Sequence, residues 1–151
     1  MAQANINPAT GLATDYLNHF NEAIMLLEML ASCPECVEDF LAWQPMSYPE
    51  HFNASRFKDR QLAIAAYENA DPMVRHCLDT LADTMTAVLE ATRATMRADL
   101  SAAAAAQLAE RSAAWLKPLV ARAGAVINGE TAAGDERANA TQAAIDLLMK
   151  R

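Results

Sequence analysis

The sequence predicts an all-α fold, a compact bundle of five or six helices that forms one domain over residues 10–151. Alanine, the strongest helix former, accounts for 34 of the 151 residues, and β-branched and aromatic residues are few. A hydrophobic content of 53% is enough for a core in a chain of this length. Apolar residues also recur at spacings of three and four. Residues 1–9 are expected to form a loose tail.

The first helix is expected over 11–31, with Thr10 or Thr14 as its cap. Its inward stripe consists of Leu12, Tyr16, Phe20, Ala23, Ile24, Leu27 and Leu30. Met25 and Met29 fall opposite this stripe, so the helix is apolar almost all round. In so short a chain we expect a second subunit to cover that side, which predicts a homodimer with Met25, Leu26 and Met29 in its interface.

An irregular connector rich in proline and aromatic residues is expected at about 32–53. Within it, the sequence Ser-Cys-Pro-Glu at 32–35 is typical of the start of a short helix. Ser47 and Glu50 have the spacing of a capping box, which predicts a further helix running toward Ala70.

The clearest helices are predicted in the second half of the chain. The range 71–97 opens with an Asp-Pro pair, and 102–128 is preceded by Ser101 and followed by Gly129, which are typical capping residues. The inward arc of the second of these helices is expected to contain Leu108, Trp115, Leu116, Leu119, Val120, Val126 and Ile127. Asp135 is expected to cap a last helix. Its inward residues would be Ala140, Ala144, Leu147 and Leu148.

Charge is distributed unevenly along the chain. Seven acidic residues precede the first basic one, Arg56, and twelve acidic and twelve basic residues follow, so the net charge of −7 lies in the first third. The resulting acidic face either docks against basic side chains of the later helices, or stays free for solubility or for a basic protein partner. Negative charge disfavours nucleic acid and membrane surfaces as partners. The N-terminus lacks the pattern of a secretory signal, and three cysteines do not make a disulfide framework, so we expect a cytoplasmic protein.

Two thiols, Cys33 and Cys36, are placed so that both could lie on the first turn of a helix, where backbone N–H groups stabilise a thiolate. The Cys-x-x-Cys resembles that of the all-α AhpD-type peroxidase-linked oxidoreductases. The resemblance implies thiol-disulfide exchange, with Cys33 attacking and Cys36 resolving. The chain departs from that family's pattern, because Phe40 stands where the family has a histidine and Asn21 where it has a glutamate. The alternative is two incidental thiols at a helix start.

Two further groups of residues and one single histidine are candidates for a functional site. Asp15, His19 and Glu22 share one sector of the first helix and resemble a partial metal site, or else an ordinary polar boundary. His76 is expected to be exposed, which resembles the acceptor histidine of a phosphotransfer domain or is simply a surface residue. The aromatic cluster of the connector could line a ligand pocket or seal the end of the bundle. This cluster consists of Trp43, Tyr48, His51 and Phe52.

No complete catalytic or metal-binding pattern occurs in the sequence. The Glu-x-x-His pairs of di-iron bundles are absent, and too few cysteines and histidines remain after the Cys-x-x-Cys for a structural zinc site. We therefore expect no cofactor. The leading functional hypothesis is a non-enzymatic cytoplasmic interaction or scaffold protein that acts as a homodimer. Thiol-disulfide exchange and histidine phosphotransfer are the alternatives.

Overall fold

The computed structural model confirms the all-α prediction. It describes residues 6–55, 58–98 and 100–130, in which six α-helices and one short 3-10 helix occur and no strand is present beyond an isolated bridge between Ile6 and Ala13. The elements in order are η2 (Thr14–Tyr16), α1 (Leu17–Met29), α2 (Cys36–Ala42), α3 (Tyr48–Ala54), α4 (Arg60–Glu68), α5 (Pro72–Arg97) and α6 (Ala102–Asn128).

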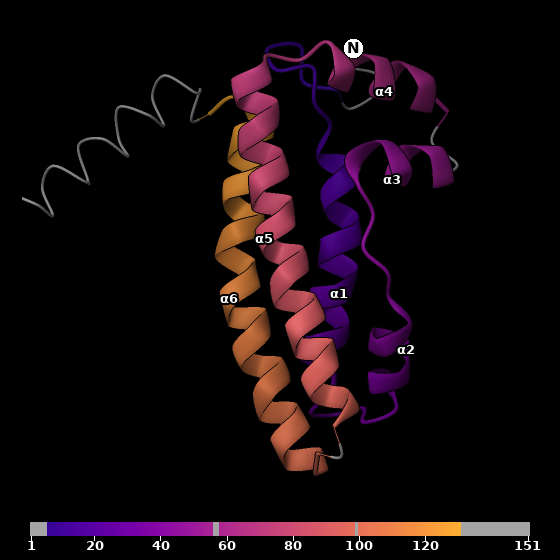
Figure 1. Cartoon of the computed structure of the whole chain (residues 1–151), viewed down its shortest axis with the longest axis vertical. Helices are drawn as coiled ribbons and strands as arrows, with labels where there is room; N and C mark the ends of the chain where they lie inside the picture. The colour runs from indigo at the N-terminus through magenta and orange to yellow at the C-terminus, as the bar shows by residue number, and fades with distance from the viewer. Residues whose placement is uncertain (1–5, 56–57, 99, 131–151) are drawn as a thin grey trace, which may run out of the picture.

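Three helices, α1, α5 and α6, form the long part of the molecule (Figure 1). The two longest, α5 and α6, pack as an antiparallel pair, and α1 packs against α6. The short helix α2 lies beside α1, while α3 and α4 contact each other near the end of the bundle where α1 begins. The second side of α1 is thus partly covered by α2 of the same chain, which weakens the reason for expecting a second subunit there.

The predicted helix ends of the second half are confirmed by their capping contacts. The Asp71 side chain accepts a hydrogen bond from the N–H of Met73, and Ser101 accepts one from the N–H of Ala104. Gly129 ends α6 with a φ of 70°, in the left-handed region that glycine occupies without strain. These ends were predictable because each cap depends on residues within three positions of it.

The N-terminal predictions need correction. Neither threonine caps α1, because the 3-10 turn η2 precedes that helix and no side-chain cap is present. The Thr10 hydroxyl instead donates to the carbonyl of Ile127 at the end of α6. A loose tail over 1–9 is wrong for residues 6–9, since Ile6 is buried and the N–H of Asn7 donates to Leu12. Residues 1–5 lie outside the described part of the chain.

The region around the expected connector is more regular than predicted in one part and less regular in another. The range 32–53 contains α2 and most of α3, so only short stretches of it are irregular. The capping box of Ser47 and Glu50 is present, with both reciprocal hydrogen bonds. The helix that it opens ends at Ala54 rather than near Ala70, because the backbone at Ser55 is extended, and α4 starts afresh at Arg60.

The inward face of α6 is made mainly of small residues. Ala109, Ser112, Ala113 and Ala123 are buried beside Leu116, whereas Trp115, which was predicted to face inward, is 61% exposed. Small side chains allow two helices to approach closely, which leaves no room for an indole between them. The last predicted helix, from Asp135 onward, lies outside the described residues.

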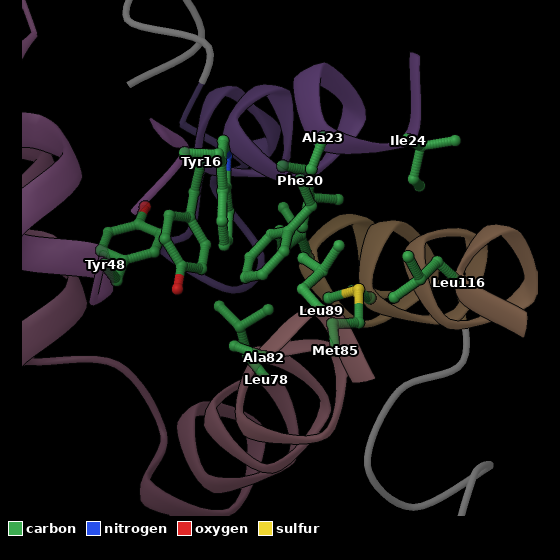
Figure 2. Packing of buried hydrophobic residues seen from close by; sticks show 14 of the residues in the cluster. Tyr16, Phe20, Ala23, Ile24, Tyr48, Leu78, Ala82, Met85, Leu89 and Leu116 are labelled. Carbon is green, nitrogen blue, oxygen red and sulfur yellow. The ribbon is translucent and has the colours of Figure 1, made fainter. Parts of the chain in front are cut away.

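The core is continuous from one end of the bundle to the other. Figure 2 shows Phe20 and Ala23 of α1 facing Met85 and Leu89 of α5, with Leu116 of α6 beside them. Tyr16 and Tyr48 extend this core toward α3. Among the described helices, none combines the length and the hydrophobicity that crossing a membrane requires.

Candidate functional site: an acidic pocket walled by tyrosines

A cavity of about 380 Å³ opens where η2, the 43–47 stretch, α3 and α5 meet. Its walls combine aromatic rings with carboxylates and contain no lysine, arginine or histidine. The lining residues are Tyr16, Pro45, Met46, Ser47, Tyr48, Glu50, Tyr67, Asp79, Ala82, Asp83 and Thr86. The cavity lies within the volume range of ordinary small-molecule sites.

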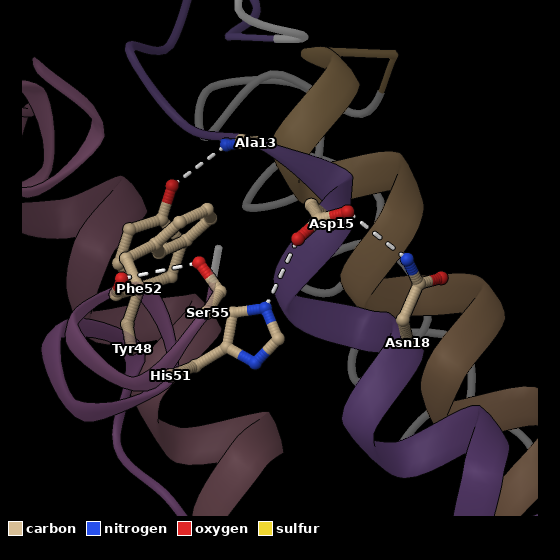
Figure 3. A network of polar contacts seen from close by, with 7 residues as sticks. All are labelled: Ala13, Asp15, Asn18, Tyr48, His51, Phe52 and Ser55. Atoms are coloured by element: carbon tan, nitrogen blue, oxygen red, sulfur yellow. Dashed lines mark hydrogen bonds and ion pairs between the residues drawn. The ribbon is translucent and has the colours of Figure 1, made fainter. Parts of the chain in front are cut away.

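The tyrosine wall is fixed by hydrogen bonds to distant backbone groups. The Tyr48 hydroxyl accepts a 2.8 Å hydrogen bond from the N–H of Ala13, as Figure 3 shows. The Tyr16 hydroxyl donates to the carbonyl of Met46 at 2.8 Å. The rings of Tyr48 and Tyr67 stack with centroids 4.6 Å apart, and that of Tyr16 lies 5.1 Å from Tyr48. Three elements distant in sequence thus present one preformed surface.

Three carboxylates line the pocket together with these rings, those of Glu50, Asp79 and Asp83. Asp79 accepts hydrogen bonds from the Tyr67 hydroxyl at 2.8 and 2.9 Å to its two oxygens. The Glu50 carboxylate accepts a 2.8 Å hydrogen bond from the backbone N–H of Ser47, and this contact, together with hydrogen bonding to the Ser47 side chain, lowers the pKa of Glu50. Burial raises the pKa of Tyr16, and the charges of Asp79, Asp83 and Glu50 raise it further. The field of all three carboxylates therefore reaches the wall of the pocket, where it is negative.

Titration of the tyrosines provides a direct test of this environment. Burial raises the pKa of Tyr48 to about 12, and burial with the Asp79 hydrogen bond raises that of Tyr67 to about 12; the pKa of Tyr16 is raised as well. These are all the tyrosines of the chain. Because the folded pKa values exceed the unfolded value near 10, their contribution to stability is complete below pH 10 and is lost as the pH rises toward 12. We expect absorbance at 295 nm to show almost no tyrosinate at pH 10.5 in the native protein, and a normal titration in guanidinium chloride.

The metal candidates of the first helix are not brought together. Asp15 contacts His51 of α3, whose Nε2 donates to the carboxylate at 3.1 Å, and it accepts a second hydrogen bond from Asn18 (Figure 3). His19 donates instead to the carbonyl of Gln44, and Glu22 is exposed. Among the described residues, no three of histidine, cysteine, aspartate and glutamate form a group that could hold a metal ion.

The predicted aromatic cluster divides between the pocket and the core. Tyr48 lines the cavity, whereas Trp43 and Phe52 are buried in the core and His51 pairs with Asp15. Trp43 stacks on His19 with centroids 4.5 Å apart, and its indole N–H donates to the His19 carbonyl at 3.0 Å. Arg93 of α5 donates to the Trp43 carbonyl. This part of the cluster therefore attaches the 43–47 stretch to α1 and α5, and so positions one wall of the pocket.

The thiol pair has the wrong electrostatic environment for a nucleophile. Cys36 is buried, and the Cys33 thiol donates to the Glu35 carboxylate at 3.0 Å. Hydrogen bonding with Cys36 and then with Glu35 raises the pKa of Cys33 to about 12. An attacking thiol needs a pKa near or below the ambient pH. The raised pKa of Cys33 and the burial of Cys36 therefore give the redox hypothesis no support.

Alkylation should reveal this environment. We expect iodoacetamide to modify Cys33 at pH 7.5 more slowly than it modifies glutathione, because so little thiolate is present. Glu35→Gln removes the charge that opposes the thiolate, so it should lower the pKa of Cys33 and speed its alkylation. Mass spectrometry of peptides taken at intervals would measure both rates, and Glu38→Gln, which removes an equal charge from the next turn, is the control. Rapid alkylation of the unaltered protein would contradict the assignment.

His76 is exposed on α5, as predicted, and it makes no hydrogen bond or ion pair with the described residues. Its neighbour on the same helix, Asp79, is held by Tyr67 and faces the pocket. Among residues 6–55, 58–98 and 100–130, no hydrogen bond or ion pair joins a basic side chain to the imidazole. Phosphotransfer therefore stays a hypothesis without structural support.

Comparisons with protein-family models, with curated proteins and with solved structures give no match for this chain. The site must therefore be interpreted from its own chemistry. Of the pocket residues, the sequence identified only Tyr48 as part of a ligand site. Tyr16 was assigned to the core, and Asp79 and Asp83 were not among the candidate site residues. Asp79 and Asp83 are four residues apart, so both fall on one side of a helix, and this spacing was the one local pattern that indicated the charged wall.

Proposed function

We propose that the protein is a non-enzymatic interaction protein whose acidic pocket binds a positively charged group of a basic partner. One observation supports this most strongly: Glu50, Asp79 and Asp83 converge on a preformed cavity that contains no basic residue. An ammonium or guanidinium group would neutralise this charge. Location in the cytoplasm, expected because three cysteines do not make a disulfide framework, belongs to the same proposal.

The tyrosine rings strengthen this electrostatic attraction. They form an aromatic wall beside Asp79, which is partly buried, whereas Glu50 and Asp83 are exposed, and charges interact more strongly where water is partly excluded. Tyr16 and Tyr48 are almost fully buried, at 2% and 1% exposure, so the wall is already ordered before a ligand arrives. A preorganised site loses less conformational entropy on binding.

The chain itself supplies an example of a cation at the edge of this pocket. The Arg75 guanidinium carbon lies 5.7 Å from the centre of the Tyr67 ring, and its nitrogen donates to the carbonyls of Tyr67 and Glu68. Arg75 does not line the cavity, so the carboxylates of Asp79 and Asp83 remain open on the other side. A partner's cation would bind through those carboxylates rather than over the Tyr67 face.

The experiment that tests the proposal uses N-acetyl-lysine methylamide as the probe and its Nε-acetylated form as the neutral control. Amide shifts of Ser47, Glu50 and Asp83 in NMR spectra should saturate with the charged probe, with a dissociation constant on the order of 1 mM, or about −4 kcal/mol. The neutral probe should cause no saturable shift. Equal shifts with both probes would show that charge is not recognised, and the proposal would then be wrong.

A homodimer remains part of this proposal. Met25 and Met29 of α1 are 52% and 41% exposed, and both point away from the core. Leu26 differs from the prediction, because it is partly buried and packs against the core of its own chain. The proposed contact between subunits therefore rests on the two methionines, whose flexible thioethers adapt to a partner surface.

Light scattering combined with size-exclusion chromatography tests the dimer. At micromolar concentration we expect twice the chain mass, and Met25→Glu with Met29→Glu should reduce it to the mass of a monomer, because paired carboxylates cannot be buried in an apolar contact. Gln61→Glu with Gln107→Glu adds the same charge at exposed positions elsewhere and should leave the dimer intact. A monomer before any substitution would refute this part of the proposal.

A further inference from the structure

An apolar cavity of about 260 Å³ lies at the end of the bundle opposite to α3 and α4, where α1 and α5 end and α6 begins (Figure 1). Two of its lining side chains, those of Leu30 and Met96, are buried. Val37 of α2 is partly buried, and Pro34 and Leu100 are exposed. The cavity therefore runs from the core to the surface, and several segments of the chain surround it.

The remaining wall of the cavity belongs to α6 and consists of Ala102, Ala105 and Ala106. Further along the same helix, Ala109 and Ala113 are only 0% and 3% exposed, because the neighbouring helices pack closely over them. Ala105 and Ala106 are also small, but they are only partly buried. At these two positions the small side chains leave a space that no neighbouring helix fills.

The chemistry of the lining determines which ligands can bind. No lining side chain carries a charge, and the thioether of Met96, a weak acceptor, is the only polar group among these side chains. Water in such a space finds no strong side-chain partner, and an apolar group that displaces poorly ordered water gains affinity. A charged ligand would lose its hydration without gaining an ion pair. The lining therefore favours an uncharged, apolar ligand.

We propose that this cavity is a binding site for a small neutral apolar molecule of about the size of a substituted benzene ring. An apolar cavity of about 150 Å³ is large enough to bind benzene, so 260 Å³ accommodates a ring with a substituent. The flexible side chain of Met96 can adjust to the shape of the ligand. The inference is independent of the cation pocket, because the two cavities share no lining residue.

An apolar groove on the α5 and α6 pair is a less suitable site for such a molecule. Residues of these two helices alone line it, among them Val88, Leu108 and Trp115. A ring lying between two helices stays in contact with solvent on its outer side. In the smaller cavity the ring contacts α1, α2, α5 and α6 in turn, so more of its surface is removed from water.

NMR titration of the full chain tests the proposal, with toluene as the probe and benzoate, the same ring with a charged substituent, as the control. The methyl signals of Leu30, Val37 and Met96 should shift and saturate with toluene, with a dissociation constant on the order of 1 mM. Benzoate should cause no saturable shift of these signals. The proposal would be wrong if toluene caused no saturable shift here, or if it shifted the methyl signals of Val88 and Leu108 instead.

Filling the cavity provides the second test. Ala105→Leu should weaken toluene binding at least about tenfold, because the larger side chain occupies the space that the ring needs. Ala103→Leu makes the same change at an exposed position of α6 outside the lining and should leave the affinity unchanged. Ala102→Leu, at an exposed position of the lining, is used if a thermal unfolding curve shows that Ala105→Leu is not folded. Unchanged affinity in the folded lining variant, or an equal loss in Ala103→Leu, would overturn the assignment.

Discussion

Tyr48→Ala should lower the free energy of unfolding by about 3–5 kcal/mol, the range observed when a buried aromatic side chain is removed. Tyr48 is fully buried, and its ring contacts those of Tyr16, Phe52 and Tyr67. The substitution would leave a cavity between η2, α3 and α4, and it would remove the Tyr48 hydroxyl that accepts the hydrogen bond of the Ala13 N–H. Urea unfolding followed by circular dichroism would measure the loss.

Tyr48→Phe separates the contribution of ring packing to stability from that of the hydrogen bond to Ala13. It keeps the ring and its packing, but it leaves the buried Ala13 N–H without the hydroxyl, which should lower the free energy of unfolding by about 1–3 kcal/mol. If the two variants were equally unstable, the hydrogen bond alone would hold the N-terminal stretch to α3. If Tyr48→Ala unfolded as easily as a surface variant does, the aromatic cluster would not be part of the core.

Local sequence patterns predicted the fold because the decisive contacts are local. Asp71 and Ser101 act on N–H groups two and three residues away, and Gly129 ends α6 by its own backbone conformation. Trp115 shows where this reasoning failed. The spacing of apolar residues in α6 placed Trp115 on the same inward side as Leu116. The side of α6 that packs against α5 is instead made largely of Ser112 and alanines, and these small residues contribute little to a hydropathy pattern.

The candidate site could not be predicted in the same way, because its contacts join residues far apart in sequence. The Tyr48 hydroxyl meets the N–H of Ala13 across 35 residues, and Tyr67 reaches Asp79 from a different helix. Composition did indicate an acidic molecule, but it placed the excess charge in the first third. The pocket instead combines Glu50 of that third with Asp79 and Asp83 of α5. The number of acidic and basic residues is equal from Arg56 on, so the composition of that part gave no sign of a local negative charge.

The acidic residues of the first third therefore have different roles in the folded chain. Asp15 is paired with His51, and Glu28 forms an ion pair with Lys117 of α6, as expected for an acidic face that docks against a later helix. Glu50 is held charged by its capping contact with Ser47. Docking and a free acidic surface were alternatives for the whole region. One ion pair, Glu28 with Lys117, joins it to a later helix, and other acids of the region are exposed, namely Glu22, Glu35, Glu38 and Asp39.

Asp79→Asn combined with Asp83→Asn should weaken binding of N-acetyl-lysine methylamide at least about tenfold, which corresponds to about 1.4 kcal/mol. The double change removes two of the three charges of the pocket and leaves its shape almost unaltered, since each amide replaces a carboxylate of the same size. Glu50 is left in place because its capping box with Ser47 starts α3, so its loss would confuse binding with folding. The affinity would be measured by NMR titration in low salt.

A matched variant distinguishes binding at a local site from attraction by the overall negative charge of the molecule. Glu38→Gln with Glu110→Gln removes two exposed carboxylates from α2 and α6, outside the pocket, and should change the affinity less than twofold if recognition is local. Asp79→Asn also weakens the hydrogen bond from Tyr67, so a thermal unfolding curve must show that the variant is folded at the temperature of the titration. If both double variants weakened binding equally, the probe would be responding to the net charge of the molecule, and Asp79 and Asp83 would lose their assigned role.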